Sequence, residues 1–323
     1  QMKFYFSHAR TALKYGIKSL NLDSNSEIFL PKFICQVMLY PLLENNIKII
    51  FYDIEDDFSV DFQKLKKKVT SNSKAFIGVN YFGHFQDYNK VIKFCDEYNL
   101  IFIEDNSHSY MGKFNNTHTG SLGDISISSP RKFININCGG ILQINNKSKL
   151  DLPVIPKYPI KNKLIVKEYL KSFPTIINLL KKYLVKKTDY LDPYNNFEEE
   201  IPDYLIDDIS LNQINQTDWN KLINERRNNY RIWSNWSQKN EIETVFPSLQ
   251  IGENPWCFVG YVKSKSLKKK ILNWGIKNNY FIFTWPTLPK QFINEKSNPY
   301  EIWKKIICFS TNNYFTKNEP KNL

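Results

Sequence analysis

The chain has 323 residues, of which 42% are hydrophobic and 15% aromatic, and its formal net charge is +12. This length allows one large domain and a smaller one, and the apolar fraction supplies a sizeable core, which excludes a wholly disordered chain. The basic charge alone would suit nucleic acid, but the lysines are spread over the whole chain without a recognition helix, zinc-finger spacing or RNA-binding signature, so we expect no nucleic-acid partner.

Short apolar runs in the first half predict strands that alternate with helices. The strands are expected at residues 27–31, 47–52, 75–79 and 100–104. Between the last two, Val91, Phe94, Cys95 and Tyr98 recur at helical spacing. This alternation favours a mostly parallel sheet that is covered on both faces. In such sheets, ligands collect at the carboxyl ends of the strands.

The pattern changes between residues 151 and 205. Three prolines precede a basic amphipathic stretch over residues 165–184, which would suit a membrane-surface helix. Because Pro174 interrupts it, we prefer a linker helix that packs between domains or across a dimer. The chain is therefore predicted to have a large domain over residues 1–160 and a linker or interface segment over 161–205.

A smaller C-terminal α/β domain is predicted over residues 206–323. It opens with a helical stripe from Trp219 to Trp233. Strands are expected at residues 259–262, 281–285 and 306–309, around a helix near 264–274.

The cysteines and the apolar runs bear on the compartment. None of the five cysteines forms a CxxC motif, so we expect free thiols in a reducing cytoplasm and no metal site. No apolar run approaches the length of a membrane span, and the N-terminus lacks a signal pattern. We therefore expect a cytoplasmic protein without stable membrane insertion.

Glycine is scarce, yet five of the eleven glycines fall between residues 112 and 140, directly after a predicted strand. Such clustering is typical of a site where the backbone turns tightly or approaches a ligand. The strand ends in Asp105, and His108 follows. Then come a Gly-Ser-Leu-Gly-Asp string at 120–124, the run Ser128-Ser129-Pro130-Arg131-Lys132, and a Gly-Gly pair at 139–140.

These groups are the ones that a pyridoxal site needs. A lysine amine forms a Schiff base, a carboxylate keeps the pyridinium nitrogen protonated so that the ring accepts electrons, and hydroxyls and helix-terminal amides hold the phosphate. Taken singly, Asp105 would be a helix cap, His108 a structural hydrogen-bonding residue and Lys132 a surface charge. Their order and spacing together favour the site.

The same segments resemble a known family. "IEDNSHSYMGKF" and "HTGSLGDISISSPRKFININCGGIL" are similar to the cofactor region of the DegT/DnrJ/EryC1/StrS family, and "HARTALKYG" resembles its phosphate-side loop. Its members are aminotransferases that use pyridoxal 5'-phosphate, many of them on nucleotide-linked keto-sugars. The resemblance implies PLP-dependent transferase fold type I, an α/β architecture with a mostly parallel seven-stranded sheet and a smaller C-terminal α/β domain. It also implies a homodimer.

Carried over to this sequence, the resemblance gives three residues a role at the cofactor ring. Lys132 would form the Schiff base and then shuttle a proton. Asp105 would pair with the pyridinium nitrogen, and His108 would hydrogen-bond the ring oxygen or pack beside the ring. Cys35 stands where the family often has a stacking aromatic residue, and Phe33 is expected to point to the other face of its strand.

The resemblance also implies the phosphate ligands. Ser129, with Ser128 as second choice, would bind the phosphate together with the backbone at Ala9 and Arg10. The Arg10 side chain could add a bidentate contact or point elsewhere.

Three functions remain open from the sequence. The preferred one is amino-group transfer, with glutamate as the donor, to a keto-sugar linked to a nucleotide, in surface-glycan biosynthesis. The second is a cofactor-binding protein of the same fold with other chemistry or a non-sugar keto substrate. The third is a non-enzymatic basic binding protein. Family dehydratases replace the Schiff-base lysine with histidine, so Lys132 favours transamination.

Overall fold

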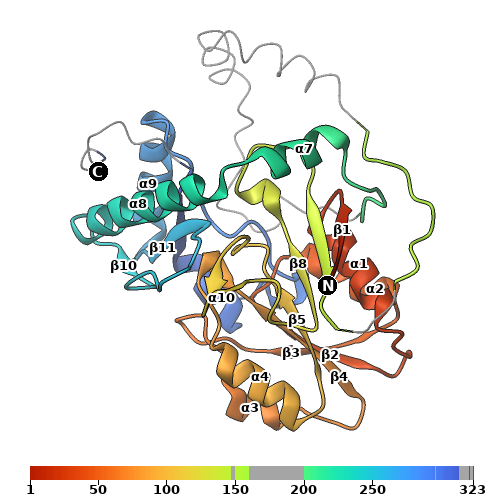
Figure 1. Cartoon of the computed structure of the whole chain (residues 1–323). Helices are drawn as coiled ribbons and strands as arrows, with labels where there is room; N and C mark the ends of the chain where they lie inside the picture. The colour runs from red at the N-terminus through yellow and green to blue at the C-terminus, as the bar shows by residue number, and fades with distance from the viewer. Residues whose placement is uncertain (147–149, 160–199, 295, 313–319, 321–322) are drawn as a thin grey trace.

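The computed structural model describes residues 1–146, 150–159, 200–294, 296–312, 320 and 323. Its large sheet has seven strands in the order β1-β9-β8-β5-β4-β2-β3 (Figure 1). From β8 to β3 the neighbours pair in parallel, whereas β9 pairs antiparallel with both β8 and β1. The strands are β1 (Met2–Phe6), β2 (Glu27–Pro31), β3 (Lys48–Tyr52), β4 (Ser73–Val79), β5 (Ile101–Asp105), β8 (Ile125–Ser128) and β9 (Gly140–Ile144).

The central strands are buried on both faces, although β8 alternates isoleucine with serine. Every residue of β2, β8 and β9 is buried. Helix α1 (Ala9–Ser19) packs against β1, β8 and β9, and α4 (Tyr88–Glu97) packs against β4 and β5. The remaining short elements of this half are η1 (Gln36–Met38), α2 (Tyr40–Glu44), α3 (Phe62–Lys66), η2 (Tyr81–Gly83), β6 (Lys113–Phe114), β7 (Thr117–His118) and η3 (Pro130–Lys132).

A second, four-stranded antiparallel sheet forms in the C-terminal part, in the order β10-β11-β13-β12. The helices around it lie beside the large sheet in Figure 1. The elements are α7 (Asp208–Gln216), α8 (Trp219–Gln238), β10 (Glu243–Thr244), β11 (Cys257–Tyr261), α9 (Lys265–Lys277), β12 (Ile282–Phe283), η4 (Lys290–Phe292), α10 (Asn298–Lys305) and β13 (Ile306–Ser310).

The two sheets share one hydrophobic core. The main cluster of buried side chains runs from the strands of the large sheet to Val259, Trp285 and Ile302 of the C-terminal part. A smaller cluster around Trp233 and Trp236 joins α8 to the other face of the C-terminal sheet, which carries Phe258 and Phe309. The C-terminal elements are therefore packed onto the large sheet through apolar side chains.

The α/β fold with a mostly parallel seven-stranded sheet is confirmed. The strand expected at 27–31 has those bounds, and the one expected at 281–285 is only Ile282–Phe283. Strands β1 and β9 were not expected, and β9 begins at Gly140, the second residue of the glycine pair. The proposed division into domains stays a prediction, and the amphipathic stretch at 165–184 lies outside the described residues.

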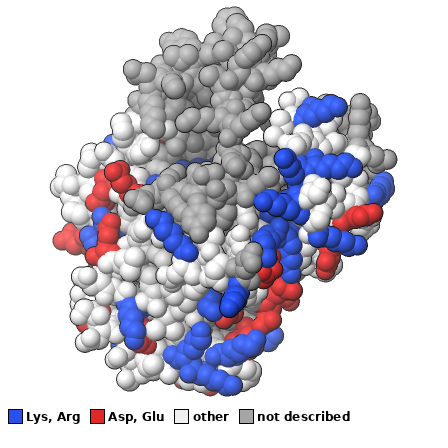
Figure 2. Space-filling view, turned by 180° about the vertical axis from the view of Figure 1, so that it is seen from behind, with Lys and Arg blue, Asp and Glu red and all other residues white. Residues whose placement is uncertain are grey.

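The surface supports the interpretation of the lysines as solvated. On the face shown in Figure 2, lysine and arginine side chains are interspersed with acidic ones. Ion pairs also occur at the surface, between Lys66 and Glu97 at 3.0 Å and between Lys90 and Asp87 at 3.0 Å. Within the described part of the chain, no helix is both long and apolar enough to span a membrane.

Candidate active site

The parallel strands β5 and β8 bring the polar residues of the glycine-rich segment to one edge of the large sheet. Asp105 is the last residue of β5, opposite Ile127 in the register, and Ser128 ends β8. The loop after Asp105 carries His108, and the turn η3 after Ser128 carries Lys132. Carboxyl ends of neighbouring parallel strands are where α/β sheets bind ligands.

The Lys132 amine lies among uncharged and aromatic groups. Its Nζ is 4.7 Å from the centroid of the Trp256 ring, and the side chain keeps partial exposure. No described residue forms a hydrogen bond with Nζ. Burial lowers the pKa of Lys132, against the attraction of Cys35 and Asp105. The neutral amine is therefore more populated than it is for a surface lysine.

Asp105 and His108 are the other two titratable groups of the site. Burial raises the pKa of Asp105, while Ser107 and Lys132 act to lower it. The backbone N–H of Ser107 donates to Asp105 Oδ1 at 2.9 Å. Burial, together with Lys132, holds the pKa of His108 well below its usual value, so the ring is neutral. Its Nδ1 accepts from the backbone N–H of Phe82 at 3.3 Å, which leaves the proton on Nε2.

Aromatic rings from distant parts of the chain surround His108 and Lys132. The His108 ring stacks on Trp256, with centroids 4.4 Å apart, and on Phe82 at 5.9 Å. Trp285 meets His108 edge-on at 5.5 Å. Sequence reasoning missed Trp256, because only the fold brings it beside Lys132.

The two serine candidates differ in their surroundings. Ser128 Oγ accepts a hydrogen bond from Asn106 Nδ2 at 3.3 Å, so it already has a partner. The side chain of Ser129, which precedes η3, caps no backbone amide of that turn, and no described residue bonds to it. Ser129 is therefore the better placed of the two to bind a ligand.

The start of α1 lies close to the lysine turn through the glycine pair. The Gly139 backbone N–H donates to Ser7 O at 2.7 Å. A Cβ on Gly140 would lie 2.1 Å from the carbonyl carbon of His8, so only glycine allows this approach. Ala9, the first residue of α1, is thus brought toward η3 as the resemblance implies.

Arg10 and Cys35 were left open by the sequence. The Arg10 side chain is buried and donates from Nε to Glu200 O at 3.1 Å, so it contacts the segment before α7. Cys35 is partly exposed, and burial of its thiol raises the pKa to about 11. Phe33 is fully buried and packs on Trp285 at 4.8 Å, a ring that itself contacts His108, so the expected orientation of Phe33 away from the cofactor stays a prediction.

Glu104 is a buried carboxylate that the sequence analysis did not single out. Its two oxygens accept five hydrogen bonds, from the backbone N–H groups of Gly120, Leu122 and Gly123, from the Tyr88 hydroxyl and from Asn80 Nδ2. It therefore anchors the Gly-Ser-Leu-Gly-Asp string. A charged residue inside an apolar strand is the signal that could have identified it, because a buried charge needs partners.

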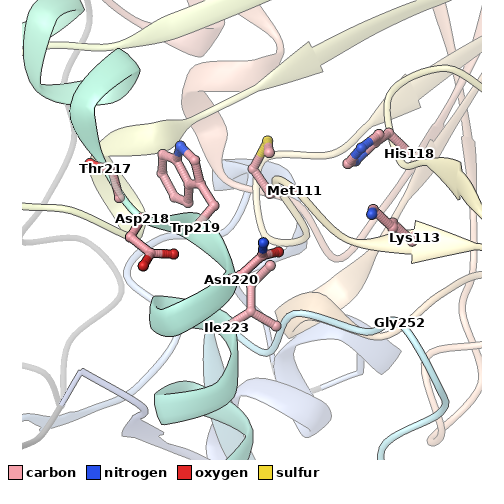
Figure 3. A pocket seen from close by; sticks show the side chains of 9 residues that line it. All are labelled: Met111, Lys113, His118, Thr217, Asp218, Trp219, Asn220, Ile223 and Gly252. Atoms are coloured by element: carbon pink, nitrogen blue, oxygen red, sulfur yellow. The ribbon is translucent and has the colours of Figure 1, made fainter.

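A separate cleft of about 540 Å³ lies between the β6–β7 hairpin and the start of α8. Figure 3 shows Lys113 and His118 on one wall and Asp218 with Trp219 on the other. Trp219 packs edge-on against Tyr110, and Tyr110 contacts Phe133 of the lysine turn. Tyr110 thus links a residue that lines the cleft to the residue after Lys132.

Comparisons with known proteins agree with this geometry. Residues 5–151 match the model of the DegT/DnrJ/EryC1/StrS aminotransferase family. The chain is 24% identical to GDP-perosamine synthase of Escherichia coli O157:H7, over 45% of this chain and 41% of that protein. The matched stretch therefore spans less than half the length of this curated relative.

Solved structures share the fold over nearly the whole chain. Helicobacter pylori PseC, an aminotransferase involved in the biosynthesis of pseudoaminic acid, has a TM-score of 0.68 at 18% identity, covering 97% of this chain and 82% of that one. E. coli GDP-4-keto-6-deoxy-D-mannose-3-dehydratase with bound hydrated PLP has a TM-score of 0.63 at 20% identity, covering 96% and 83%.

Proposed function

Because residues 5–151 match the model of the DegT/DnrJ/EryC1/StrS aminotransferase family, we propose that the chain is an aminotransferase dependent on pyridoxal 5'-phosphate. It transfers an amino group, with glutamate as the donor, to a keto-sugar linked to a nucleotide, in surface-glycan biosynthesis. The observation that carries the proposal is the meeting of the Lys132 amine, the Asp105 carboxylate and the neutral His108 ring at one edge of the sheet.

The residues present fit this cofactor. Lys132 Nζ makes no hydrogen bond with the described residues, and Asn106 Oδ1 and Ser107 Oγ are buried without a partner among them. Buried polar atoms normally have partners, so unpaired ones beside Asp105 favour a bound polar group. Lys132 would hold the cofactor covalently, Asp105 would face its ring nitrogen, and His108 would donate from Nε2 to its ring oxygen. Ser129 and the amides at the start of α1 would hold its phosphate.

When bound, the cofactor supplies an electron sink for the carbon that loses a proton. Lys132 Nζ takes that proton and returns it at the neighbouring carbon, a task that suits an amine whose pKa is lowered by burial. Asp105 would stabilise the protonated ring nitrogen of the bound cofactor. The rings of Trp256, Phe82 and Trp285 exclude water from the reacting atoms.

The relatives include dehydratases as well as transaminases. Lys132 separates the two reactions, because a lysine at this position can both hold the cofactor and move the proton, whereas the family's dehydratases have histidine there. Retention of the lysine therefore supports amino transfer.

A cytoplasmic homodimer is a further part of the proposal. The five cysteines are free thiols, which fits a reducing compartment. The dimer rests on the family resemblance.

Absorbance spectroscopy of the half-reactions tests the proposal. Purified protein loaded with pyridoxal phosphate should lose its visible absorbance when glutamate is added. A panel of nucleotide-linked keto-sugars and simple keto acids should then be screened for recovery of the band, with recovery by a keto-sugar expected. Bound cofactor that glutamate leaves unchanged would contradict transamination, and recovery with simple keto acids alone would contradict the sugar substrate.

A further inference from the structure

Arg226 is a buried arginine of α8 whose described partners are all neutral. It is 1% exposed, and no carboxylate of the described residues lies within salt-bridge distance of it. Burial lowers its pKa to about 9. Burying a guanidinium among uncharged acceptors is costly, so a specific set of contacts must hold it there.

One arm of the guanidinium reaches the lysine turn. Nη2 donates to Phe133 O at 2.8 Å and to Lys132 O at 3.4 Å. It also contacts Asn312 Oδ1. The guanidinium carbon lies 4.7 Å above the centroid of the Phe133 ring. These carbonyls belong to the last residue of η3 and the residue after it, so Arg226 fixes the backbone from which the Lys132 side chain extends.

The other arm reaches the segment that carries Trp256. Nη1 donates to Pro255 O at 3.2 Å, to Trp256 O at 3.3 Å and to Thr311 Oγ1 at 2.8 Å. The Thr311 hydroxyl also lies 2.8 Å from Pro255 O and 2.9 Å from Trp256 O. The planar guanidinium therefore donates to the backbone carbonyls of both Lys132 and Trp256, and the side chains of these two residues are in contact.

We propose that Arg226 is a positioning residue, which sets the place of the Lys132 amine against the Trp256 ring by holding both backbones at once. Its importance for catalysis rests on the proposed function, but the positioning itself needs no cofactor. If the fork is lost, the lysine turn loosens and the amine moves toward water. The pKa of Lys132 then returns toward its ordinary value of about 10.5.

Reductive methylation of the full-length, cofactor-free protein tests this inference. Formaldehyde with cyanoborohydride labels neutral amines, and peptide mass spectrometry follows Lys132 across a pH series, with exposed Lys93 as the internal reference. The midpoint of the pH profile is the readout, because a change in access scales the rate equally at every pH. In Arg226→Lys the midpoint should rise by about one unit, equivalent to about a tenfold smaller neutral fraction at pH 7.5.

Arg227→Lys is the matched control. Arg227 is the next residue of α8 and also donates to backbone carbonyls, of Gln250 at 3.0 Å and Glu253 at 2.7 Å, without reaching the lysine turn. In Arg227→Lys, the midpoint of Lys132 labelling should equal that of the wild type. Equal midpoints in Arg226→Lys and the wild type, or the same shift in both variants, would overturn the proposal.

A second variant tests the inference if Arg226→Lys does not fold. Thr311→Val keeps the side-chain shape and removes the hydroxyl that binds Arg226 Nη1. It should raise the Lys132 midpoint in the same direction by a smaller amount, and an unchanged midpoint would count against the inference. Failure of the wild type to capture pyridoxal phosphate would refute the proposed function while leaving these midpoints to decide the role of Arg226.

Discussion

A lysine amine acts as a base near neutral pH only where its surroundings disfavour the charged form, and the site around Lys132 meets this condition. Burial lowers the pKa of Lys132, while Asp105 opposes that shift by attracting the charged amine. The neutral His108 ring adds no positive charge of its own. On the proposed function, Asp105 would therefore have two roles, which are to pair with the cofactor ring and to limit the loss of the lysine proton.

Asp105→Asn separates catalysis from folding at the residue scale. Without the carboxylate, the ring nitrogen has no anionic partner, and turnover should fall on the order of 10²-fold or more. The pKa of Lys132 should fall further, because the attraction that raises it is gone. Steady-state kinetics and the melting temperature should be measured together, with exposed Asp96→Asn as the control. Unchanged turnover in Asp105→Asn would contradict the assigned role.

Strand β5 supplies one residue to the candidate site and another that anchors a neighbouring loop. Successive residues of a strand point to opposite faces of the sheet. Asp105 contributes to the site at the end of β5, and Glu104 before it binds three backbone amides of residues 120–123. Burial raises the pKa of Glu104, whereas these amides and Tyr88 lower it. The loop that leads into β8, and so toward Lys132, is therefore anchored by the neighbour of a proposed cofactor ligand.

Glu104→Gln tests this anchor at the element scale. Glutamine replaces one of the two carboxylate oxygens with an NH₂ donor, so the N–H groups that this oxygen accepts from lose their acceptor. Each buried donor without a partner costs about 1–3 kcal/mol, and the free energy of unfolding should fall by roughly 3 kcal/mol or more. Urea denaturation measures it. The matched variant Glu97→Gln, on the surface beside Lys66, should leave the unfolding free energy nearly unchanged. Equal stability in both variants would show that the anchor is dispensable.

At the scale of the whole molecule, the sequence indicated those site residues that lie close together in the chain. Asp105, His108 and Lys132 lie within one stretch of 28 residues, and the order of motifs was enough to group them. Trp256 and Arg226 lie about a hundred residues further on, in the C-terminal part, and nothing in their local pattern marks them. Arg226 reads as one of several basic residues on a helix, and only its burial against the lysine turn distinguishes it.

The central claim is that Lys132 holds the cofactor, and reduction with borohydride tests it most directly. Protein incubated with pyridoxal phosphate is treated with borohydride, digested and mapped by peptide mass spectrometry. We predict that the reduced cofactor is found on the peptide containing Lys132 and is absent from that peptide in Lys132→Ala, which should also lack visible absorbance. Protein that gains no visible absorbance with the cofactor, or a label confined to other lysines, would contradict the account.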